Sequence, residues 1–454
     1  MERQLLDKLL IWKNKNDGSI LLVSGACGVG KSYLLSQLLG SHFSQLYQFN
    51  IVENPELLTQ LNNNMQPSQF VALLELLHGT PIDPQGLIVF TGLDSLNQFV
   101  MENPSLTPAK LSNWLALLQR IASKAPQLSI AASCVDCGEL ATNQLNGLTH
   151  HTLRPLSFRE FLHASPHRAL AKTFTKQVLS PAAHQRLSEQ FRDYCFTGGM
   201  PQAVATWFNL NQASICERIN AVSAIHQQHL SQLQQAMLGS NLPVAPLRAL
   251  LEQIAKQLAS ATYTSVQRFK FKGVFQQKNR YQDFAQAIKW LENQHWLLAN
   301  YPLSGSLTPP LSQQQKPSMV KLFLYDIGLL HYLLGLDYKS LKLGTESYPS
   351  YLMQSFVQQE LAALGHYPSY SWHDARAEME FIIPHSSGAV LPIEVKSPLR
   401  TRAKSLPSYQ KKCQPQQTVK LHAGFPPADC TTTHHWPLYF CEFALNLLPL
   451  PNQP

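Results

Sequence analysis

The chain has few charged residues, and its cysteines form no recognisable framework of pairs. Asp, Glu, Lys and Arg make up 14% of its 454 residues, and the 8 cysteines are scattered along the sequence. The start mixes charged and apolar residues without an apolar core of signal-peptide length, and no apolar run approaches membrane-spanning length. These absences argue against a secreted disulfide scaffold and a membrane protein. We therefore expect a cytoplasmic protein with no membrane partner.

Two further features bear on metals and partners. Cys134 and Cys137 form a C-x-x-C, but no second pair stands at zinc-site spacing, which favours free thiols over a metal or redox role. The formal net charge is +8, which weakly favours a polyanionic partner, nucleic acid before membrane. A solvated basic surface without such a partner explains the charge equally well.

The first 155 residues alternate short apolar runs with amphipathic helical patterns. This alternation predicts an α/β fold with a parallel sheet covered on both faces. The expected strands are residues 19–25, 46–52, 86–92 and 127–133, and the expected helices are 31–41, 71–79 and 111–124.

The rest of the chain divides into three further parts. Residues 156–240 are helical in pattern and are expected to form a lid. Residues 241–310 run helix, turn, helix and short strand, a layout that suits a winged helix. After a stretch rich in Pro, Ser and Gln, residues 311–454 are expected to form a second α/β domain, with a helix at 351–364 and a strand hairpin near 378–396.

The stretch "GACGVGKS" matches the phosphate-binding loop pattern G-x-x-x-x-G-K-[ST] between a strand and a helix. Glycines let consecutive backbone N–H groups turn inward around phosphate oxygens, Lys31 adds a point charge, and the Ser32 hydroxyl can ligate Mg²⁺. The motif predicts binding of ATP with Mg²⁺. The expected binding residues are Gly25, Ala26, Cys27, Gly28, Val29, Gly30, Lys31, Ser32 and Tyr33.

The acids that usually complete such a site are missing. The apolar run 87–90 ends in Thr91 and Gly92, where a carboxylate would hold Mg²⁺ through water and a second would orient the attacking water. Asp94 lies three residues past Thr91 and reaches the site only if the loop folds back. Loss of a water-orienting group costs a factor of about 10²–10⁴ in rate. We therefore expect nucleotide binding with weak or absent hydrolysis.

A second set of carboxylates lies near the C-terminus. In the strand "LPIEVKS", Glu394 and Lys396 share one face, and a turn centred on Ser387 would place Glu380 directly across from Glu394. Two carboxylates facing each other require a cation, either a divalent metal or Lys396. Glu360 falls on the apolar stripe of the helix 351–364. We expect Glu360, Glu380, Glu394 and Lys396 to converge, with Glu380 and Glu394 as metal ligands; ordinary surface charges on a solvent-facing hairpin are the alternative.

The stretch "SVQRFKFKGVFQQKNRYQ" places basic residues among aromatic ones. This pattern suits phosphate contacts with base stacking, DNA being the favoured nucleic acid. The alternative is that the aromatic residues belong to the core and the basic residues are their solvated neighbours.

Six blocks in order make the chain resemble a large bacterial and archaeal family of AAA-type ATPases. Its members join a P-loop domain to a winged helix and a C-terminal domain that resembles restriction endonucleases. The blocks are "GACGVGKS", "LSIAAS", "RPLSFREFL", "TGGMPQAV", "LFLYDIGLLHYLLG" and "AEMEFIIPHSSGAVLPIEVKS". The resemblance implies Asp-Glu where this chain has Thr91 and Gly92, an arginine where it has Leu148, and an aspartate where it has Glu380.

Three functions remain open on this basis. The first is an ATP-binding switch whose nucleotide state is coupled to a winged helix and a nuclease-like domain acting on nucleic acid. The second is an ATP-regulated, metal-dependent nuclease that uses Glu360, Glu380, Glu394 and Lys396. The third is an inactive scaffold that binds a protein partner or forms a homo-oligomer.

Overall fold

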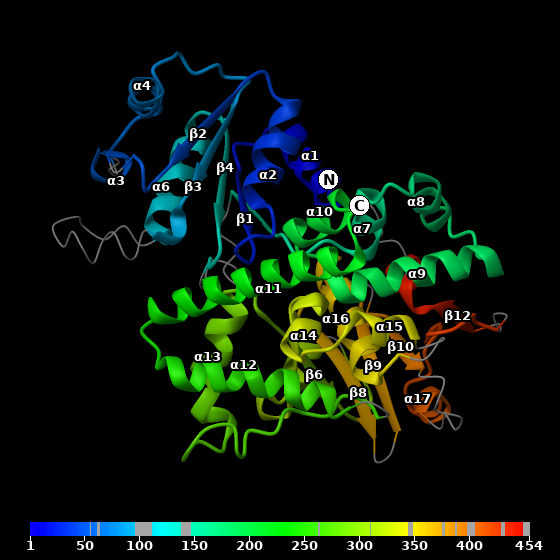
Figure 1. The fold of residues 1–454 in the computed structure, drawn as a ribbon. Helices are drawn as coiled ribbons and strands as arrows, with labels where there is room; N and C mark the ends of the chain where they lie inside the picture. The colour runs from blue at the N-terminus through cyan, green and yellow to red at the C-terminus, as the bar shows by residue number, and fades with distance from the viewer. Residues whose placement is uncertain are drawn as a thin grey trace. The chain divides into compact units, whose positions relative to one another are not determined.

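The computed structural model describes the chain except for residues 55, 61–63, 96–110, 138–146, 262–263, 309, 344–347, 375–376, 386–387, 397–404, 428–431 and 448–454. The chain divides into two compact units (Figure 1). Unit 1 comprises Met1–Arg154 and Asn293–His295, and unit 2 comprises Pro155–Glu292 and Trp296–Pro454. The further division into lid, winged helix and nuclease-like domain stays a prediction. Within the described ranges, no helix is long and apolar enough to cross a membrane.

Unit 1 contains a five-stranded sheet in which every neighbouring pair is parallel, in the order β2-β3-β4-β1-β5. Its strands are β1 (Ile20–Ser24), β2 (Leu46–Asn50), β3 (Leu87–Thr91), β4 (Ser129–Cys134) and β5 (Leu148–Thr152). The four predicted strands and their parallel arrangement are confirmed. Strand β5 was not predicted, because its sequence "LTHHT" is mostly polar and it lies at the sheet edge, where partial exposure removes the apolar signal.

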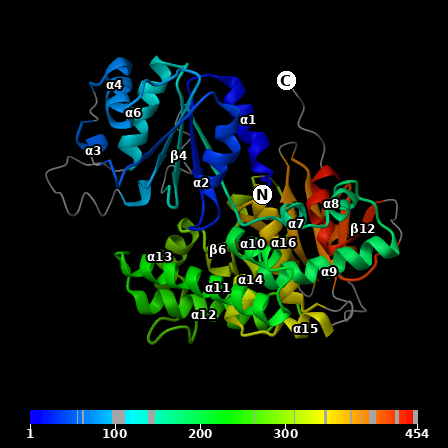
Figure 2. The same cartoon turned by 45° about the horizontal axis from the view of Figure 1, so that its top comes forward.

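Helices cover both faces of this sheet, as the sequence predicts. Figure 1 and Figure 2 show α1 and α2 on one face and α4 and α6 on the other. Trp114 and Leu118 of α6 pack with Phe90 of β3 in the larger core of the unit. The helices are α1 (Leu5–Lys15), α2 (Lys31–Tyr33), which continues as a π-helix (Leu34–Leu39) and a 3-10 turn (Gly40–His42), α3 (Glu56–Gln60), α4 (Pro67–His78), a 3-10 turn (Leu93–Ser95) and α6 (Leu111–Lys124).

Unit 2 contains a seven-stranded mixed sheet in the order β12-β11-β10-β9-β8-β6-β7. Strands β10, β11 and β12 are parallel to one another, whereas β9 pairs antiparallel with both of its neighbours. The strands are β6 (Leu297–Leu303), β7 (Lys321–Leu324), β8 (Ser369–Asp374), β9 (Ala377–Pro384), β10 (Val390–Lys396), β11 (Thr418–His422) and β12 (Thr433–Pro437). The hairpin predicted near 378–396 is therefore confirmed as β9 and β10.

Helices make up most of the remainder of unit 2. They are α7 (Phe158–Ala164), α8 (Arg168–Thr175), α9 (Pro181–Thr197), α10 (Pro201–Asn209), α11 (Ile215–Leu238), α12 (Val244–Ala259), α13 (Tyr281–Asn293), α14 (Ile327–Leu333), α15 (Tyr338–Leu343), α16 (Ser350–Ala363) and α17 (Ser405–Cys413), with 3-10 turns at Leu311–Gln314, Pro317–Met319 and Leu438–Leu447. The helix, turn, helix and strand expected in residues 241–310 occur as α12, α13 and β6. Strand β6, however, lies inside the seven-stranded sheet, between β7 and β8.

Helix α16 is the central element of unit 2, because every residue from Ser350 to Ala362 is buried although several are polar. Its polar side chains accept hydrogen bonds from segments far away in the sequence. Gln354 accepts from the Val266 N–H at 3.2 Å, and Gln359 accepts from the Ile327 N–H at 2.8 Å. Buried polar groups are stable only when they are paired, so α16 fixes these segments by satisfying their backbone.

A close contact between two sequence blocks explains the glycine at position 198. Asp326, at the N-terminus of α14, accepts hydrogen bonds from the Gly199 N–H at 2.7 Å and the Leu329 N–H at 2.9 Å. A Cβ atom at Gly198 would lie 2.2 Å from the Asp326 carboxylate, and Gly198 has φ of +72°. The blocks "TGGMPQAV" and "LFLYDIGLLHYLLG" are therefore packed against each other and serve the fold.

Replacing Gly198 by Ala is expected to lower the free energy of unfolding by about 3 kcal/mol, because the new methyl group adds backbone strain to a clash with Asp326. Gly335→Ala is the matched control, since Gly335 has φ of +61° but open space around its Cβ position. That variant should lose only about 1 kcal/mol. Denaturant unfolding measures both, and equal losses would show that the contact with Asp326 contributes nothing.

Candidate functional site

The P-loop follows β1 and leads directly into α2, as the motif predicts. Gly25, Gly28 and Gly30 have φ of +154°, +80° and +93°, values that side chains rarely adopt. A Cβ atom at Gly25 would lie 2.3 Å from the Leu153 carbonyl oxygen. The Lys31 ammonium donates to the carbonyl oxygens of Gly25 at 2.7 Å and Ala26 at 3.1 Å. The loop is thus wrapped around its own lysine at the carboxyl end of β1.

Some of the remaining P-loop side chains are buried and anchor the loop, and others are exposed to solvent. Ala26 and Val29 are buried, whereas Cys27 and Ser32 are exposed, as is Tyr33 at the first turn of α2. Burial lowers the pKa of Lys31, and the negative charge of Asp94 opposes this shift. Lys31 is therefore placed close to Asp94, which follows β3.

An N-terminal arginine supports the loop, although no sequence motif indicates this role. Arg3 is buried and donates to the Val29 carbonyl at 2.9 Å and to the Arg154 carbonyl at 2.5 Å. The Met1 ammonium donates to the Tyr33 hydroxyl at 3.1 Å. Position in the sequence could not reveal Arg3, because its role depends on packing of α1 against the P-loop helix.

Strand β3 ends without an acid, and the local geometry has no room for one at Gly92. Gly92 has φ of +77°, and a Cβ atom there would lie 2.3 Å from the Asn50 Oδ1. Asn50 ends β2, the neighbouring strand. A glutamate at position 92 would therefore require both strained backbone and displacement of Asn50.

Asp94 does fold back toward the site. Its Oδ1 accepts a hydrogen bond from the Val135 N–H at 2.6 Å, and its carboxylate also accepts from the Asp136 N–H. The side chain keeps access to solvent, yet partial burial raises the pKa of Asp94; the hydrogen bond from Val135 and the charge of Lys31 oppose that rise. Asp94 is therefore the acid that the structure places beside the P-loop lysine.

Leu148, which stands where the family resemblance implies an arginine, begins β5 and pairs with Ile20. It packs against the larger core of unit 1. Its side chain thus serves the sheet, and it brings no positive charge to the site. Leu145 and Asn146 lie outside the described residues.

Glu380 is buried at an irregular point in β9. The register between β8 and β9 shifts between Tyr370 and Trp372, which leaves Glu380 and Phe381 opposite the single residue Ser371. Glu380 accepts from the Ser265 hydroxyl at 2.9 Å and from the Val395 N–H at 3.1 Å. Burial, followed by the charges of Glu378 and Glu394, raises the pKa of Glu380 to about 7.

Glu394 is paired with a lysine on the next strand. It is buried on β10, directly beside Lys420 of β11, and its Oε2 lies 3.7 Å from the Lys420 ammonium. Strands β9 and β10 pair in the predicted register up to Ile393 opposite Phe381, and the next position in that register matches Glu394 with Glu380. Lys396 ends β10, and its side chain lies outside the described residues. Lys420 is thus a cation that the spacing of the motif did not suggest.

Glu360 lies in the core of unit 2. Its Oε1 accepts from the Phe158 N–H at 2.9 Å and the Tyr194 hydroxyl at 3.3 Å. Burial, followed by the charges of Glu442 and Glu160, raises the pKa of Glu360 well above its ordinary value. Glu360 therefore holds the block "RPLSFREFL" against α16, and none of its described contacts is with Glu380 or Glu394.

A metal cluster is not formed by the described side chains. Among them, no group of three or more His, Cys, Asp and Glu residues could hold a metal ion. The expected convergence of Glu360, Glu380, Glu394 and Lys396 consequently stays a prediction. Glu380 and Glu394 lie on neighbouring strands, and the charge of Glu394 helps to raise the pKa of Glu380. The described partners of Glu360 are instead the Phe158 N–H and the Tyr194 hydroxyl.

In the stretch of basic and aromatic residues between α12 and α13, two of the aromatic residues are buried and the basic residues beside them are solvated. Phe269 and Phe271 are buried and their rings lie 5.0 Å apart, whereas Arg268, Lys270 and Lys272 are exposed. These two aromatic rings therefore belong to the core and are not available for base stacking. The exposed cations keep the ability to contact phosphate.

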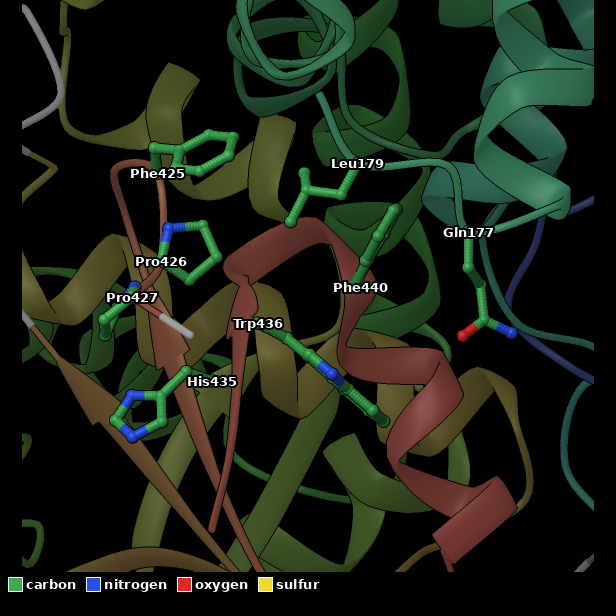
Figure 3. A pocket seen from close by; sticks show the side chains of 8 residues that line it. All are labelled: Gln177, Leu179, Phe425, Pro426, Pro427, His435, Trp436 and Phe440. Atoms are coloured by element: carbon green, nitrogen blue, oxygen red, sulfur yellow. The ribbon is translucent and has the colours of Figure 1, made fainter. Parts of the chain in front are cut away.

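A pocket of about 400 Å³ lies at the β12 edge of unit 2 (Figure 3). Figure 3 shows that its lining is largely aromatic and proline-rich; the residues are Gln177, Leu179, Phe425, Pro426, Pro427, His435, Trp436 and Phe440. His435 hydrogen-bonds to His422 with 2.9 Å between Nδ1 and Nε2. His435 belongs to the partly buried strand β12. This lining contains no carboxylate and no lysine or arginine, so it does not suit phosphate.

Comparisons with known proteins give little further information about the site. Residues 188–340 are similar to a family described as a domain of unknown function (DUF8612). No curated protein matches the chain. A solved structure of PCH-2 from C. elegans is similar with 11% identity and a TM-score of 0.27, over 48% of this chain and 63% of that chain. The chain thus spans less than two thirds of PCH-2, and a likeness at this TM-score carries no argument.

The placement of Glu360 predicts different effects of two substitutions. Glu360→Ala leaves the buried Phe158 N–H without an acceptor and should lower the free energy of unfolding by about 2–4 kcal/mol. Glu360→Gln keeps the acceptor and should fold normally.

The same residue predicts a pH dependence. The folded-state pKa of Glu360 is raised above 4.5, so its stabilising contribution is complete at low pH and is lost as pH rises. The free energy of unfolding of Glu360→Gln should therefore rise relative to that of the wild type, by up to about 1 kcal/mol per pH unit, as pH increases above the unfolded-state pKa of glutamate. Exposed Glu189→Gln is the control and should show no such trend. A constant difference between Glu360→Gln and wild type would mean that Glu360 is ionised in the fold.

Proposed function

We propose that the protein is an ATP-binding switch of the AAA type that hydrolyses ATP slowly or not at all. The observation that carries this proposal is the conformation of Gly25–Ser32: three glycines with positive φ between a buried parallel strand and a helix, with Lys31 at the centre. Ligands of parallel sheets bind at the carboxyl ends of the strands, where this loop lies. Oriented backbone N–H groups in such a loop suit phosphate.

The residues of the loop fit ATP with Mg²⁺. The Gly25 backbone approaches Leu153 too closely for any side chain, so glycine is required for the loop to take this path. Lys31 would donate to phosphate oxygens in place of its own loop carbonyls, and the exposed Ser32 hydroxyl would hold Mg²⁺. Bound Mg²⁺ supplies charge neutralisation for the phosphates.

Weak hydrolysis follows from what surrounds the loop. Thr91 is uncharged, and Gly92 cannot be replaced by a larger residue without strain. Asp94 can contribute one carboxylate, but it is already engaged by the N–H groups of Val135 and Asp136. With no acid at Thr91 or Gly92 and with Asp94 held by these N–H groups, the site favours holding a nucleotide over cleaving it.

We further propose that nucleotide state governs how the rest of the chain acts on nucleic acid, with DNA as the favoured partner. The exposed Arg268, Lys270 and Lys272 support phosphate contacts by this part of unit 2. The described contacts of Glu360, Glu380 and Glu394 support DNA cleavage less than the exposed cations support DNA binding. A switch that binds DNA therefore accounts for the described side chains better than a nuclease.

Lys31→Ala is expected to weaken binding of ATP with Mg²⁺ at least about tenfold, because the charge-assisted contact with phosphate is lost. Calorimetric titration measures the affinity, and phosphate release measures turnover. Lys124→Ala, which removes an exposed lysine of the same unit, should bind like the wild type. Unchanged binding by Lys31→Ala would refute the nucleotide site, and rapid phosphate release by the wild type would refute the switch.

DNA is expected to be bound but not cut. Incubation of the wild type with plasmid and single-stranded DNA in Mg²⁺ or Mn²⁺ should leave the DNA intact, because no group of three or more His, Cys, Asp and Glu residues among the described ones could hold a metal ion. Glu394→Gln is the control for contaminating nucleases. Cutting by the wild type that is lost in Glu394→Gln would contradict the switch and support the nuclease; binding of neither ATP nor DNA would support a protein-binding scaffold.

A further inference from the structure

The loop Cys134–Cys137 lies beside the P-loop and holds Asp94 in place. Cys134 ends β4, and the two residues between the cysteines are Val135 and Asp136. The N–H groups of both middle residues donate to the Asp94 carboxylate, with 2.6 Å between the Val135 nitrogen and Oδ1. The position of Asp94 therefore depends directly on the conformation of the C-x-x-C loop.

The two thiols are in direct contact and differ in character. Cys134 is fully buried and hydrogen-bonds to Cys137, which is 6% exposed. The Cys137 sulfur also lies 3.7 Å from the His150 Nε2, and that nitrogen lies 2.8 Å from the Ser24 Oγ. The hydrogen bond from Cys134, together with those from His150 and Ser24, lowers the pKa of Cys137, while the pKa of Cys134 is raised.

This arrangement suits disulfide formation. The thiolate is the reactive form of cysteine, and a neighbouring thiol resolves an oxidised sulfur. The negative charge of the Cys137 thiolate is stabilised by Ser24 of β1 and His150 of β5. These groups are already in place and do not have to move for the reaction. The second thiol is already within hydrogen-bond reach of the first.

We propose that Cys134 and Cys137 form a reversible disulfide that releases Asp94 and so weakens binding of nucleotide with Mg²⁺. The regulatory part of this proposal rests on the proposed nucleotide site. The oxidant is a hydroperoxide such as hydrogen peroxide, and the reductant is a small thiol.

The reaction balances in two steps. The Cys137 thiolate attacks one peroxide oxygen, the O–O bond breaks, and the departing hydroxide takes up a proton to leave as water, giving a sulfenic acid at Cys137. Cys134 then attacks the sulfenic sulfur; the S–O bond breaks, and the departing hydroxide takes the Cys134 proton to leave as a second water. Two thiols and one hydrogen peroxide thus give one disulfide and two waters.

The consequence for Asp94 follows from the size of the loop. A disulfide requires an S–S distance of about 2.05 Å, shorter than any hydrogen bond between thiols. Val135 and Asp136 lie within the ring that this bond closes, so closing it is expected to turn their N–H groups away from Asp94. Asp94 then loses its donors and is free to pair with Lys31, in competition with phosphate.

Thiol oxidation and nucleotide affinity can be measured on the same full-length samples. The Cys27→Ser background is used throughout, because Cys27 is an exposed thiol within the P-loop, and each variant is compared with its own reduced form. Samples are treated with hydrogen peroxide and then with dithiothreitol. Alkylation with mass spectrometry identifies the disulfide, and calorimetric titration gives the affinity for ATP with Mg²⁺.

Oxidation is expected to link Cys134 to Cys137 and to weaken binding about tenfold, with recovery after reduction. Cys134→Ser and Cys137→Ser should abolish the response, and Cys216→Ser, which removes an exposed cysteine of unit 2, should retain it. Free thiols at both positions after peroxide would overturn the proposal, as would a disulfide with unchanged affinity. If the reduced protein does not bind ATP, the proposed function fails, and thiol alkylation still decides whether the disulfide forms.

Discussion

The parallel sheet of unit 1 is the constraint on which the candidate site depends. Its strands all run in one direction, so the segments that follow them must emerge at the same end of the sheet, the carboxyl end of the strands. The P-loop follows β1, Asp94 follows β3, and the Cys134–Cys137 loop ends β4. These segments are separated by up to about a hundred residues, yet parallel pairing brings them together. Because helices bury both faces of the central strands, a ligand can reach the sheet at this carboxyl end.

Unit 2 is organised by a different requirement, the pairing of polar groups inside its core. Helix α16 buries glutamines and a glutamate whose oxygens accept hydrogen bonds from the Val266, Ile327 and Phe158 backbones. Each bond satisfies a donor that water cannot reach, and each also fixes a segment from elsewhere in the sequence. Polar residues in this part of the chain therefore need not indicate catalysis. Glu360 and Asp326 illustrate the point, because both are buried acceptors for backbone N–H groups.

The P-loop and the carboxylate cluster differ in how far a sequence can predict them, and the reason is physical. A P-loop is a local structure, so its glycines and lysine specify the loop almost by themselves. A carboxylate cluster depends on how separate elements pack. The register of β9 and β10 agrees with the prediction, but Glu360 of α16 accepts a hydrogen bond from the Phe158 N–H. The same limitation hid Lys420, which becomes a neighbour of Glu394 only through pairing of β10 with β11.

The sequence by itself determined the α/β class, four of the five strands of unit 1, the P-loop and the absence of acids at Thr91 and Gly92, because apolar periodicity and short motifs are local properties. Only the tertiary structure decided that Arg3 supports the P-loop, that Asp94 folds back to Val135, and that Cys137 meets His150. These contacts join residues distant in sequence through packing of strands and helices, and no local pattern encodes that packing.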